Sequence, residues 1–270
     1  MDVGSGAKQE QLPRGLGRGE MISDYAAVSN ELATQLGLKQ VAGIKDLNAE
    51  NAIFDFEEQQ LILHLLLDGK PDTLKFDLAQ GEVALRASKV SKSNEIVAKA
   101  IGCKPHYRPR VLDATAGMGR DSLMMAMLGC TVIMQERNFA IYHLLENALI
   151  RLKNSLDFKH EVSERLSLHQ QNSIESAVDN NVDVIYLDPM FPDRKKSALV
   201  KKEMRLFKLI AGDDLDSDQL LLNALENDVK RVVVKRPKGA PFLAEKKPSH
   251  EIKAKKFRYD VYGLMSGKFK

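Results

Sequence analysis

From about residue 92 onward, short apolar runs alternate with segments whose apolar residues recur at helical spacing. The runs are VLDAT (111–115), TVIMQE (131–136), RLSLHQ (165–170), VDVIYL (182–187), RVVVK (231–235) and FRYDVY (257–262). Strands connected through helices run parallel in one sheet that is covered on both faces. The sequence therefore predicts an α/β domain over residues 91–270, built on a mainly parallel sheet.

The part before residue 90 has a different pattern. Residues 23–37 (SDYAAVSNELATQLG) start with Ser, end with Gly and have apolar residues at helical spacing, which predicts a helix. LILHLLL and TLKFDL flank the turn-rich DGKPD, which predicts a hairpin, and EVALR predicts a further strand. We expect a small α+β lobe over residues 21–90. Residues 1–20, rich in glycine and charge, predict a flexible leader.

Composition excludes several classes of protein. The longest apolar run, 61–67, is interrupted by His64 and is far shorter than the roughly 20 residues of a membrane-spanning helix, so we expect a cytoplasmic protein without membrane contact. The two cysteines, Cys103 and Cys130, lack metal-ligand spacing. They are therefore predicted to be reduced, and we expect no metal site.

The net charge of +3 is unevenly distributed. Residues 191–208 contain seven Lys/Arg against two acids, and residues 228–260 contain eleven against four. Each stretch alone is typical of a solvated surface. Two such stretches in the C-terminal third indicate a surface that faces a polyanion.

The loop after the first predicted strand of the sheet has the composition of a ligand-binding loop. Glycines permit a tight turn and close approach of a ligand, and the start of the following helix exposes amide donors. A dinucleotide fingerprint needs a third glycine where Ser122 stands, and a carboxylate at the strand end would repel a pyrophosphate. A ligand with positive charge, such as S-adenosylmethionine, fits better. The candidate residues are Asp113, Gly117, Gly119, Arg120 and Asp121.

Two further strand ends are suitable for the rest of such a ligand. Glu136 follows Asp113 by 23 positions, close to the spacing at which an acid reaches ribose hydroxyls, and Arg137 could flank the adenosine. Asn172 and Ser173 are suited to the adenine edge. Each of these residues also has an ordinary alternative. A short helix is predicted from Ile174, which Asn172 or Ser173 could simply cap, and an arginine is commonly exposed.

The sequence YLDPMFP (186–192) follows the fourth predicted strand of the sheet. A carboxylate and a main-chain carbonyl held together can accept both N–H bonds of an exocyclic amino group, which localises its lone pair for attack. We therefore assign catalysis to Asp188 and the carbonyl of Pro189, with Phe191 as a ring on which a base stacks. The alternative is a strand end at which Asp188 only forms a turn.

Basic residues follow this corner and the end of a later strand. They would contact phosphates without reading a base. The predicted RNA-binding residues are Arg194, Lys195, Lys196, Lys201, Lys202, Arg205, Lys235, Arg236 and Lys238.

DATAGMGRDSL, QERN, YLDPMFPDRKKSALVKKEMR, RVVVKRP and FRYDVY together resemble the bacterial 16S ribosomal RNA guanine-N2 methyltransferases of the RsmJ type. The resemblance runs from about residue 90 to the end. It implies a class I methyltransferase fold with a Rossmann-like sheet of seven strands, S-adenosylmethionine as donor and a guanine of small-subunit rRNA as acceptor. The family's donor-binding positions fall on Arg120, Asp121, Glu136, Arg137, Asn172, Ser173 and Asp188.

The sequence thus favours methyl transfer from S-adenosylmethionine to guanine N2 of 16S rRNA, as free RNA or in the small ribosomal subunit, without a covalent enzyme intermediate. Two alternatives stay open at this point. One is an amino-methyltransferase that acts on DNA adenine or cytosine or on a protein glutamine. The other is an inactive RNA-binding assembly factor. The oligomeric state is unknown.

Overall fold

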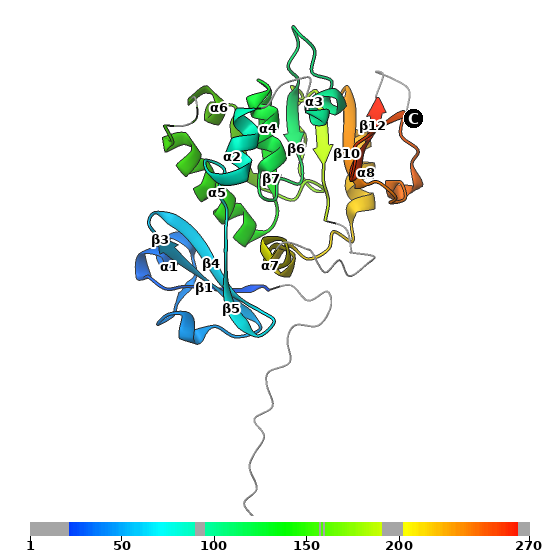
Figure 1. Ribbon diagram of the computed structural model, residues 1–270. Coiled ribbons are helices and arrows are strands. Elements are labelled where there is room, and N and C mark those ends of the chain that lie inside the picture. The colour runs from blue at the N-terminus through cyan, green and yellow to red at the C-terminus, as the bar shows by residue number, and fades with distance from the viewer. Residues whose placement is uncertain (1–21, 90–94, 157, 159, 191–201, 264–270) are drawn as a thin grey trace, which may run out of the picture.

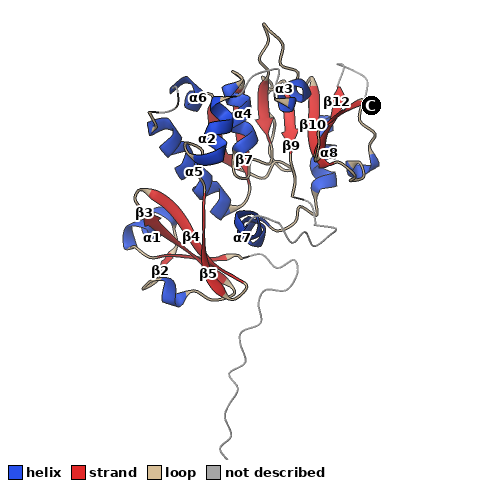
Figure 2. Cartoon of the chain, viewed as in Figure 1, coloured by secondary structure: helices blue, strands red, loops and turns tan. Residues whose placement is uncertain are grey.

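The structure is a computed structural model that describes residues 22–89, 95–156, 158, 160–190 and 202–263. Its strands form one sheet of five and one of seven. The five-stranded sheet lies below the seven-stranded one, and helix α7 (Lys202–Ala211) lies between them (Figure 1). The same view coloured by secondary structure shows helices around the upper sheet (Figure 2).

The seven-stranded sheet has the order β11-β12-β10-β9-β6-β7-β8. Strands β6 to β10 are parallel, and β12 is antiparallel to β10 and to β11. The mainly parallel α/β fold is therefore confirmed. The strands are β6 (Arg110–Asp113), β7 (Thr131–Glu136), β8 (Leu166–Gln170), β9 (Val184–Leu187), β10 (Arg231–Pro237), β11 (His250–Lys253) and β12 (Phe257–Gly263).

The strand order predicts where a ligand binds. From β6 the chain builds β7 and β8 on one side, and then crosses to build β9 and β10 on the other. Ligands of such sheets bind beyond the carboxyl ends of the strands at the point where the order reverses, here between β6 and β9.

Apolar runs in these strands arise because both faces of the sheet are covered. Side chains of successive strand residues point to opposite faces. Val111 and Val184 belong to the cluster that contains helices α3 (Ile96–Ile101), α4 (Arg120–Met127) and α5 (Phe139–Asn154), whereas Leu112 and Ile185 pack against helix α8 (Ser217–Glu226). Further helices are α2 (Gly81–Ser88), α6 (His160–Glu164) and two short 3₁₀ turns, η1 (Ile44–Asp46) and η2 (Leu243–Glu245).

The five-stranded sheet has the order β2-β1-β3-β4-β5. The predicted hairpin is confirmed, because β4 pairs antiparallel with β5. Its strands are β1 (Asp24–Ala27), β2 (Lys39–Gln40), β3 (Asn51–Glu57), β4 (Gln60–Leu67) and β5 (Lys70–Lys75).

Three local predictions were wrong. The predicted helix 23–37 starts as strand β1, and helix α1 (Asn30–Leu36) begins after Ser29, whose Oγ accepts a hydrogen bond from the Leu32 amide at 3.1 Å. The segment EVALR lies in helix α2, not in a strand. The helix expected near Ile174 is only a turn.

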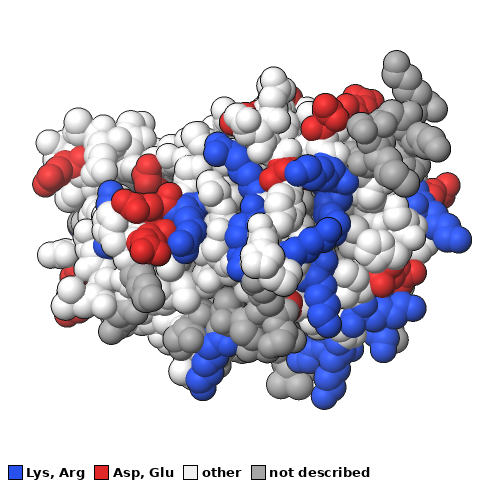
Figure 3. All heavy atoms as spheres, turned by 90° about the horizontal axis from the view of Figure 1, so that it is seen from above, with Lys and Arg blue, Asp and Glu red and all other residues white. Residues whose placement is uncertain are grey.

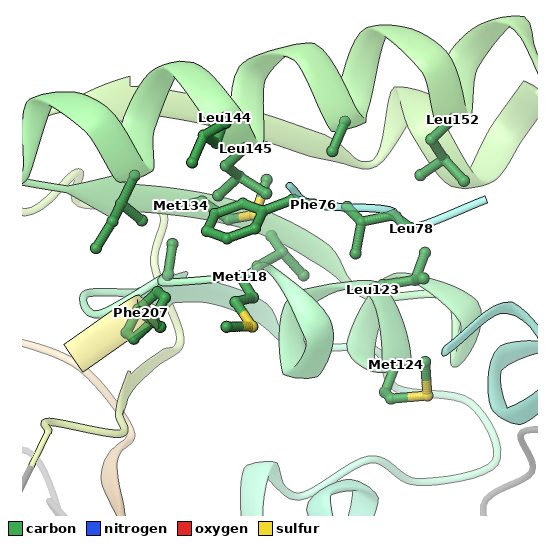
Figure 4. Packing of buried hydrophobic residues seen from close by; sticks show 14 of the residues in the cluster. Phe76, Leu78, Met118, Leu123, Met124, Met134, Leu144, Leu145, Leu152 and Phe207 are labelled. Atoms are coloured by element: carbon green, nitrogen blue, oxygen red, sulfur yellow. The ribbon is translucent and has the colours of Figure 1, made fainter. Parts of the chain in front are cut away.

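Both sheets contribute to one hydrophobic core. Phe76 and Leu78, which follow β5, lie between α5 and α4 (Figure 4). The rings of Phe76 and Phe207 have centroids 6.1 Å apart, and those of Tyr25 and Phe139 are 5.6 Å apart. Helix α2 also packs against α4, although both its ends fall within residues 21–90. The division into a lobe of 21–90 and a domain of 91–270 stays a prediction.

Gly119 allows α4 to start close to α5. Its φ is 69°, in the left-handed region, and an added Cβ would lie 2.6 Å from Cδ1 of Leu145. Leu145 is fully buried on the inner side of α5 (Figure 4). Only glycine combines this backbone conformation with this distance at low cost.

Candidate functional site

A cavity of about 580 Å³ opens at the carboxyl ends of β6, β7, β8 and β9, where the strand order reverses. Polar atoms come from the residues after these strands, and apolar side chains come from α5, α7, α8 and the turn at 174. The volume lies within the range of small-molecule sites. The lining includes Thr115, Gly117, Glu136, Arg137, Asn172, Ser173, Asp188, Met190, Asp214 and Asp216, with Ile141, Ile174, Phe207 and Leu220.

Asp113, predicted to face the ligand, lies beneath the loop and is not among the lining residues. Its carboxylate accepts hydrogen bonds from the Ser122 hydroxyl at 2.5 Å and from the Thr115 amide at 3.2 Å. Burial raises the pKa of Asp113 to about 7. In the structure this carboxyl group shapes the β6–α4 loop, while the residues that follow it line the cavity.

Glu136 ends β7 and binds the same loop from the other side. Its Oε2 accepts the Gly117 amide at 3.0 Å, and its Oε1 accepts the Asn138 amide at 2.8 Å. Burial raises the pKa of Glu136, and these two amides oppose the rise. Each carboxylate oxygen has two lone pairs, so each can accept one further hydrogen bond from a ligand hydroxyl.

Arg137, which lines the cavity, reaches from the end of β7 to the segment between α7 and α8. Its guanidinium lies 2.5 Å from Oδ1 of Asp214 and 2.5 Å from Oδ2 of Asp216. These partners raise the pKa of Arg137, Asp216 first. Asn138, which caps α5, donates from Nδ2 to the carbonyl of Ile210 at 2.9 Å. The end of β7 is therefore bonded to the end of α7.

Asn172 and Ser173, which follow β8, line the cavity as predicted. Both also form local hydrogen bonds within the protein. Asn172 accepts the Ile174 amide and donates to Glu175, which forms a local turn. The hydroxyl oxygen of Ser173 lies 2.8 Å from the Ala114 carbonyl and 2.6 Å from Oε1 of Gln135.

The corner after β9 lies directly at the cavity. The amide of Asp188 donates to Oγ1 of Thr115 at 2.7 Å, which fixes the corner to the β6–α4 loop. Oδ2 of Asp188 lies 2.7 Å from Nζ of Lys235 on β10. No described residue hydrogen-bonds to Oδ1, so this oxygen can accept a bond from a ligand. Pro189 is buried, and Phe191 lies outside the described residues.

Asp121 faces the same lysine instead of the cavity. Its Oδ2 lies 2.7 Å from Nζ of Lys235 and accepts the Tyr186 hydroxyl at 2.6 Å. Burial alone would raise the pKa of Asp121, but Lys235 and the Tyr186 hydroxyl lower it. Burial acts to lower the pKa of Lys235, but the two carboxylates raise it, so the lysine stays charged.

Arg120 and Gly119 also stand at the edge of the site and not in its lining. Arg120 forms an ion pair with Glu203 of α7, with Nη2 2.6 Å and 2.7 Å from the two carboxylate oxygens. In the described structure its guanidinium thus bonds α4 to α7.

The predicted RNA-binding residues have different environments. Lys202 pairs with Asp72 at 2.8 Å and Arg205 pairs with Asp68 at 2.7 Å, so both face the five-stranded sheet. Lys238 is exposed. Arg194, Lys195, Lys196 and Lys201 lie outside the described residues.

Two of those predictions need correction. Arg236 is 4% exposed, and its guanidinium donates to the Pro241 carbonyl, so it is not a surface cation. Lys235 is engaged with the two aspartates of the site. The physical reason is strand alternation, which directs neighbouring residues of β10 to opposite faces of the sheet.

Sequence reasoning missed Asp214, Asp216 and the role of Lys235 in the site. Asp214 and Asp216 follow α7 in a segment without a motif, and their partner Arg137 is more than 70 positions away. The only signal was the cluster of acids at 213–216 before a helix.

In the described part of the chain, no helix is both long enough and apolar enough to cross a membrane.

Comparisons with known proteins point in one direction. The family model "Putative SAM-dependent methyltransferase" matches residues 32–264. The ribosomal RNA small subunit methyltransferase J of Stutzerimonas stutzeri is 43% identical over 245 residues, which is 90% of this chain and 93% of that protein. The protein of the same name from Psychromonas ingrahamii is 47% identical over 195 residues, 72% of this chain and 77% of that protein.

A solved structure is similar as well. It is a SAM-dependent methyltransferase from Neisseria gonorrhoeae that is 27% identical. The superposition has a TM-score of 0.68 and covers 91% of this chain and 97% of the other.

Proposed function

This chain belongs to the family of SAM-dependent methyltransferases that includes ribosomal RNA small subunit methyltransferase J, and from that premise we propose that it methylates N2 of one guanine in 16S ribosomal RNA. S-adenosylmethionine is the methyl donor of this family. The proposed substrate is 16S rRNA, either free or assembled in the small subunit.

The cavity residues fit this donor. When bound, S-adenosylmethionine supplies a methyl group on a positively charged sulfur. Glu136 keeps lone pairs for ribose hydroxyls, and Asp188 provides negative charge at the rim. Ile141, Ile174 and Leu220 provide apolar surface for a purine ring. We propose that the donor-binding set is Asp113, Gly117, Gly119, Arg120, Asp121, Glu136, Arg137, Asn172, Ser173 and Asp188, of which Asp113, Gly119, Arg120 and Asp121 act by supporting the lining.

The corner at 188–190 can prepare the acceptor. An exocyclic amino group is a poor nucleophile because its lone pair is delocalised into the base. Oδ1 of Asp188 and the carbonyl of Pro189 can accept its two N–H bonds and localise the lone pair. When the N–C bond has formed, the nitrogen must lose a proton, and Asp188 is the carboxylate placed to accept it.

Burial raises the pKa of Asp188, and Lys235 opposes this rise. Its ammonium group holds Oδ2 of Asp188 at 2.7 Å and so favours the ionised form that must accept the N–H bond. This ion pair at the rim of the cavity is the observation that carries the proposal, because it leaves one oxygen of Asp188 for the acceptor.

Exposed lysines lie beside the same corner. Pro237 pairs with Phe257 at the carboxyl end of β10, and the Lys238 amide donates to the Lys256 carbonyl at 3.4 Å. The Phe257 ring lies 5.6 Å from Nζ of Lys235. We propose that RNA phosphates contact this hairpin edge, which consists of the exposed residues Lys238, Lys253, Lys255 and Lys256.

The opposite edge is basic too, but it lies away from the cavity, and two of its charges are paired with aspartates. The face seen from the top of Figure 1, where the amino ends of the parallel strands lie, shows Lys and Arg gathered at its centre (Figure 3). At those strand ends Arg110 pairs with Asp179 at 3.5 Å, and Lys230 pairs with Asp183 at 2.7 Å. We therefore place the RNA at the carboxyl edge.

The test is methylation of small-subunit RNA from a strain that lacks the enzyme, using labelled donor and both free 16S rRNA and 30S particles. We expect one labelled guanine, located at N2 by mass spectrometry. Asp188→Asn should lower turnover by about 10²-fold or more while donor binding, measured by calorimetry, is largely kept.

Duplex DNA and total protein serve as competing acceptors in the same assay. Label in either of these, with none in RNA, would replace the proposed acceptor. A wild-type protein that binds the donor but labels none of them would refute the enzyme assignment.

A further inference from the structure

Asp214, in the segment between α7 and α8, binds both main-chain polar groups of Met190. Its Oδ2 accepts the Met190 amide at 2.5 Å, and its own amide donates to the Met190 carbonyl at 2.9 Å. Its other oxygen, Oδ1, accepts a bond from Arg137. One residue therefore connects the catalytic corner after β9 to the cavity-lining arginine after β7.

The Met190 amide has a fixed relation to the catalytic carbonyl. The C=O of Pro189 and the N–H of Met190 belong to the same peptide unit, which is planar and trans. In a trans peptide these two bonds point in opposite directions. A carboxylate that holds the N–H on one side thus directs the Pro189 carbonyl to the other.

Position 190 is methionine, whose N–H Asp214 can accept. A proline at this position would lock φ but would have no N–H. The Met190 main chain is fixed by hydrogen bonds from a distant segment.

We infer that Asp214 is a positioning residue for methyl transfer: through the Met190 amide it orients the Pro189 carbonyl that accepts an N–H bond of the acceptor amino group. This inference rests on the proposed function. Arg137 shares the same carboxylate, so Asp214 also links the donor side of the cavity to the acceptor corner.

Asp214→Asn tests this role with an almost unchanged shape. Both oxygens of Asp214 accept bonds from N–H donors, whereas an amide offers one acceptor and one donor. In the variant an NH₂ group must therefore face either Met190 or Arg137. We expect kcat on rRNA to fall at least tenfold.

Asp216→Asn separates the two contacts, because Asp216 binds Arg137 but not Met190. We expect it to weaken donor binding about as much as Asp214→Asn does. Its fold loss of kcat should be at least five times smaller than that of Asp214→Asn. Asp228→Asn, an exposed aspartate before β10, is the matched control for loss of one negative charge and should match the wild type.

Met190→Pro removes the amide itself. If Asp214 acts through that amide, Asp214→Asn should change kcat by less than threefold in the Met190→Pro background, since the bond is already absent. If the two substitutions acted independently, their fold losses of kcat would multiply in the double variant. Met190→Ala keeps the amide and should keep the full tenfold effect of Asp214→Asn.

Amide exchange gives a readout without RNA or donor. In protein labelled with ¹⁵N-methionine, the Met190 amide should exchange at least tenfold faster in Asp214→Asn than in the wild type. An unchanged exchange rate together with kcat within threefold of the wild type would overturn the inference. If the wild type methylates no RNA, the proposed function fails, but the exchange rate still decides what Asp214 does.

Discussion

Nζ of Lys235 lies 2.7 Å from Oδ2 of Asp188, in a direct ion pair between the fifth parallel strand and the corner after β9. The same ammonium group lies 2.7 Å from Oδ2 of Asp121. One cation thus offsets two carboxylates beside the cavity, so its removal should change the pKa values of both.

Lys235→Met should therefore shift the pH dependence of methyl transfer. Without the ammonium group the pKa of Asp188 rises, so a higher pH is needed for the ionised form, and the acid limb of kcat/KM should move up by about one pH unit or more. Steady-state rates between pH 5 and 9 measure the limb, and circular dichroism confirms that the variant is folded. Lys235→Arg retains the charge and should leave the limb in place. An unshifted limb in Lys235→Met would contradict the role of the lysine.

Asp113 should make stability depend on pH. Its pKa is about 7 when folded and near 4 when unfolded, so the folded state binds the proton more tightly. This contribution is fully present below pH 4 and is lost as the pH rises to 7. Asp113→Asn does not titrate, so its free energy of unfolding should fall less than that of the wild type between pH 5 and 8. Urea titrations at both pH values measure the difference. Equal pH dependence of the two proteins would show that Asp113 is not buried as described.

Gly119→Ala should destabilise the fold through two effects. The left-handed φ alone costs about 1–2 kcal/mol for a residue with a Cβ. The contact at 2.6 Å with the buried Leu145 should add about 1–3 kcal/mol. Gly69→Ala is the matched control, because Gly69 has φ 75° with no atom within 4 Å of its added Cβ, so it should show the backbone cost alone. Urea unfolding measures the loss of stability in each variant, and the difference between the two losses gives the packing effect. A difference near zero would contradict this effect.

Replacing Lys238 and Lys256 by glutamine should weaken RNA binding in a salt-dependent way. Each phosphate contact contributes about 0.7 to the slope of log K against log salt for a single strand, so the slope should fall by about 1.4 in magnitude. Filter binding at several salt concentrations gives the slope, and calorimetry should show unchanged donor affinity. Lys99→Gln on α3 is the control and should keep the slope. A slope equal to that of the wild type would exclude this edge from the RNA interface.

The sequence predicted the seven-stranded part well because its signals are local. Strands covered on both faces read as continuous apolar runs, and α5 has its capping Asn138 directly before its first residue. The short antiparallel β11 was missed, since His250–Lys253 is mostly exposed and pairs only with β12.

The failures depend on distant partners. Asp24–Ala27 forms a strand because it lies between β2 and β3, whereas its own residues are compatible with the helix that starts six positions later. In the site, the sequence located Glu136 and Asp188 at strand ends. It did not show that Lys235 reaches Asp121 and Asp188 while Arg236 is buried, since the partners of both side chains lie in other segments of the fold.

Helix α7 is held from two directions. Glu203 is bonded to Arg120 at the start of α4, while Lys202 and Arg205 are bonded to Asp72 and Asp68 of the five-stranded sheet. The same helix delivers the chain to Asp214. The N-terminal sheet thus supplies two of the ion-pair partners of the helix that leads to Asp214. We expect a chain trimmed to begin after β5 to lose methylation even if RNA still binds to it.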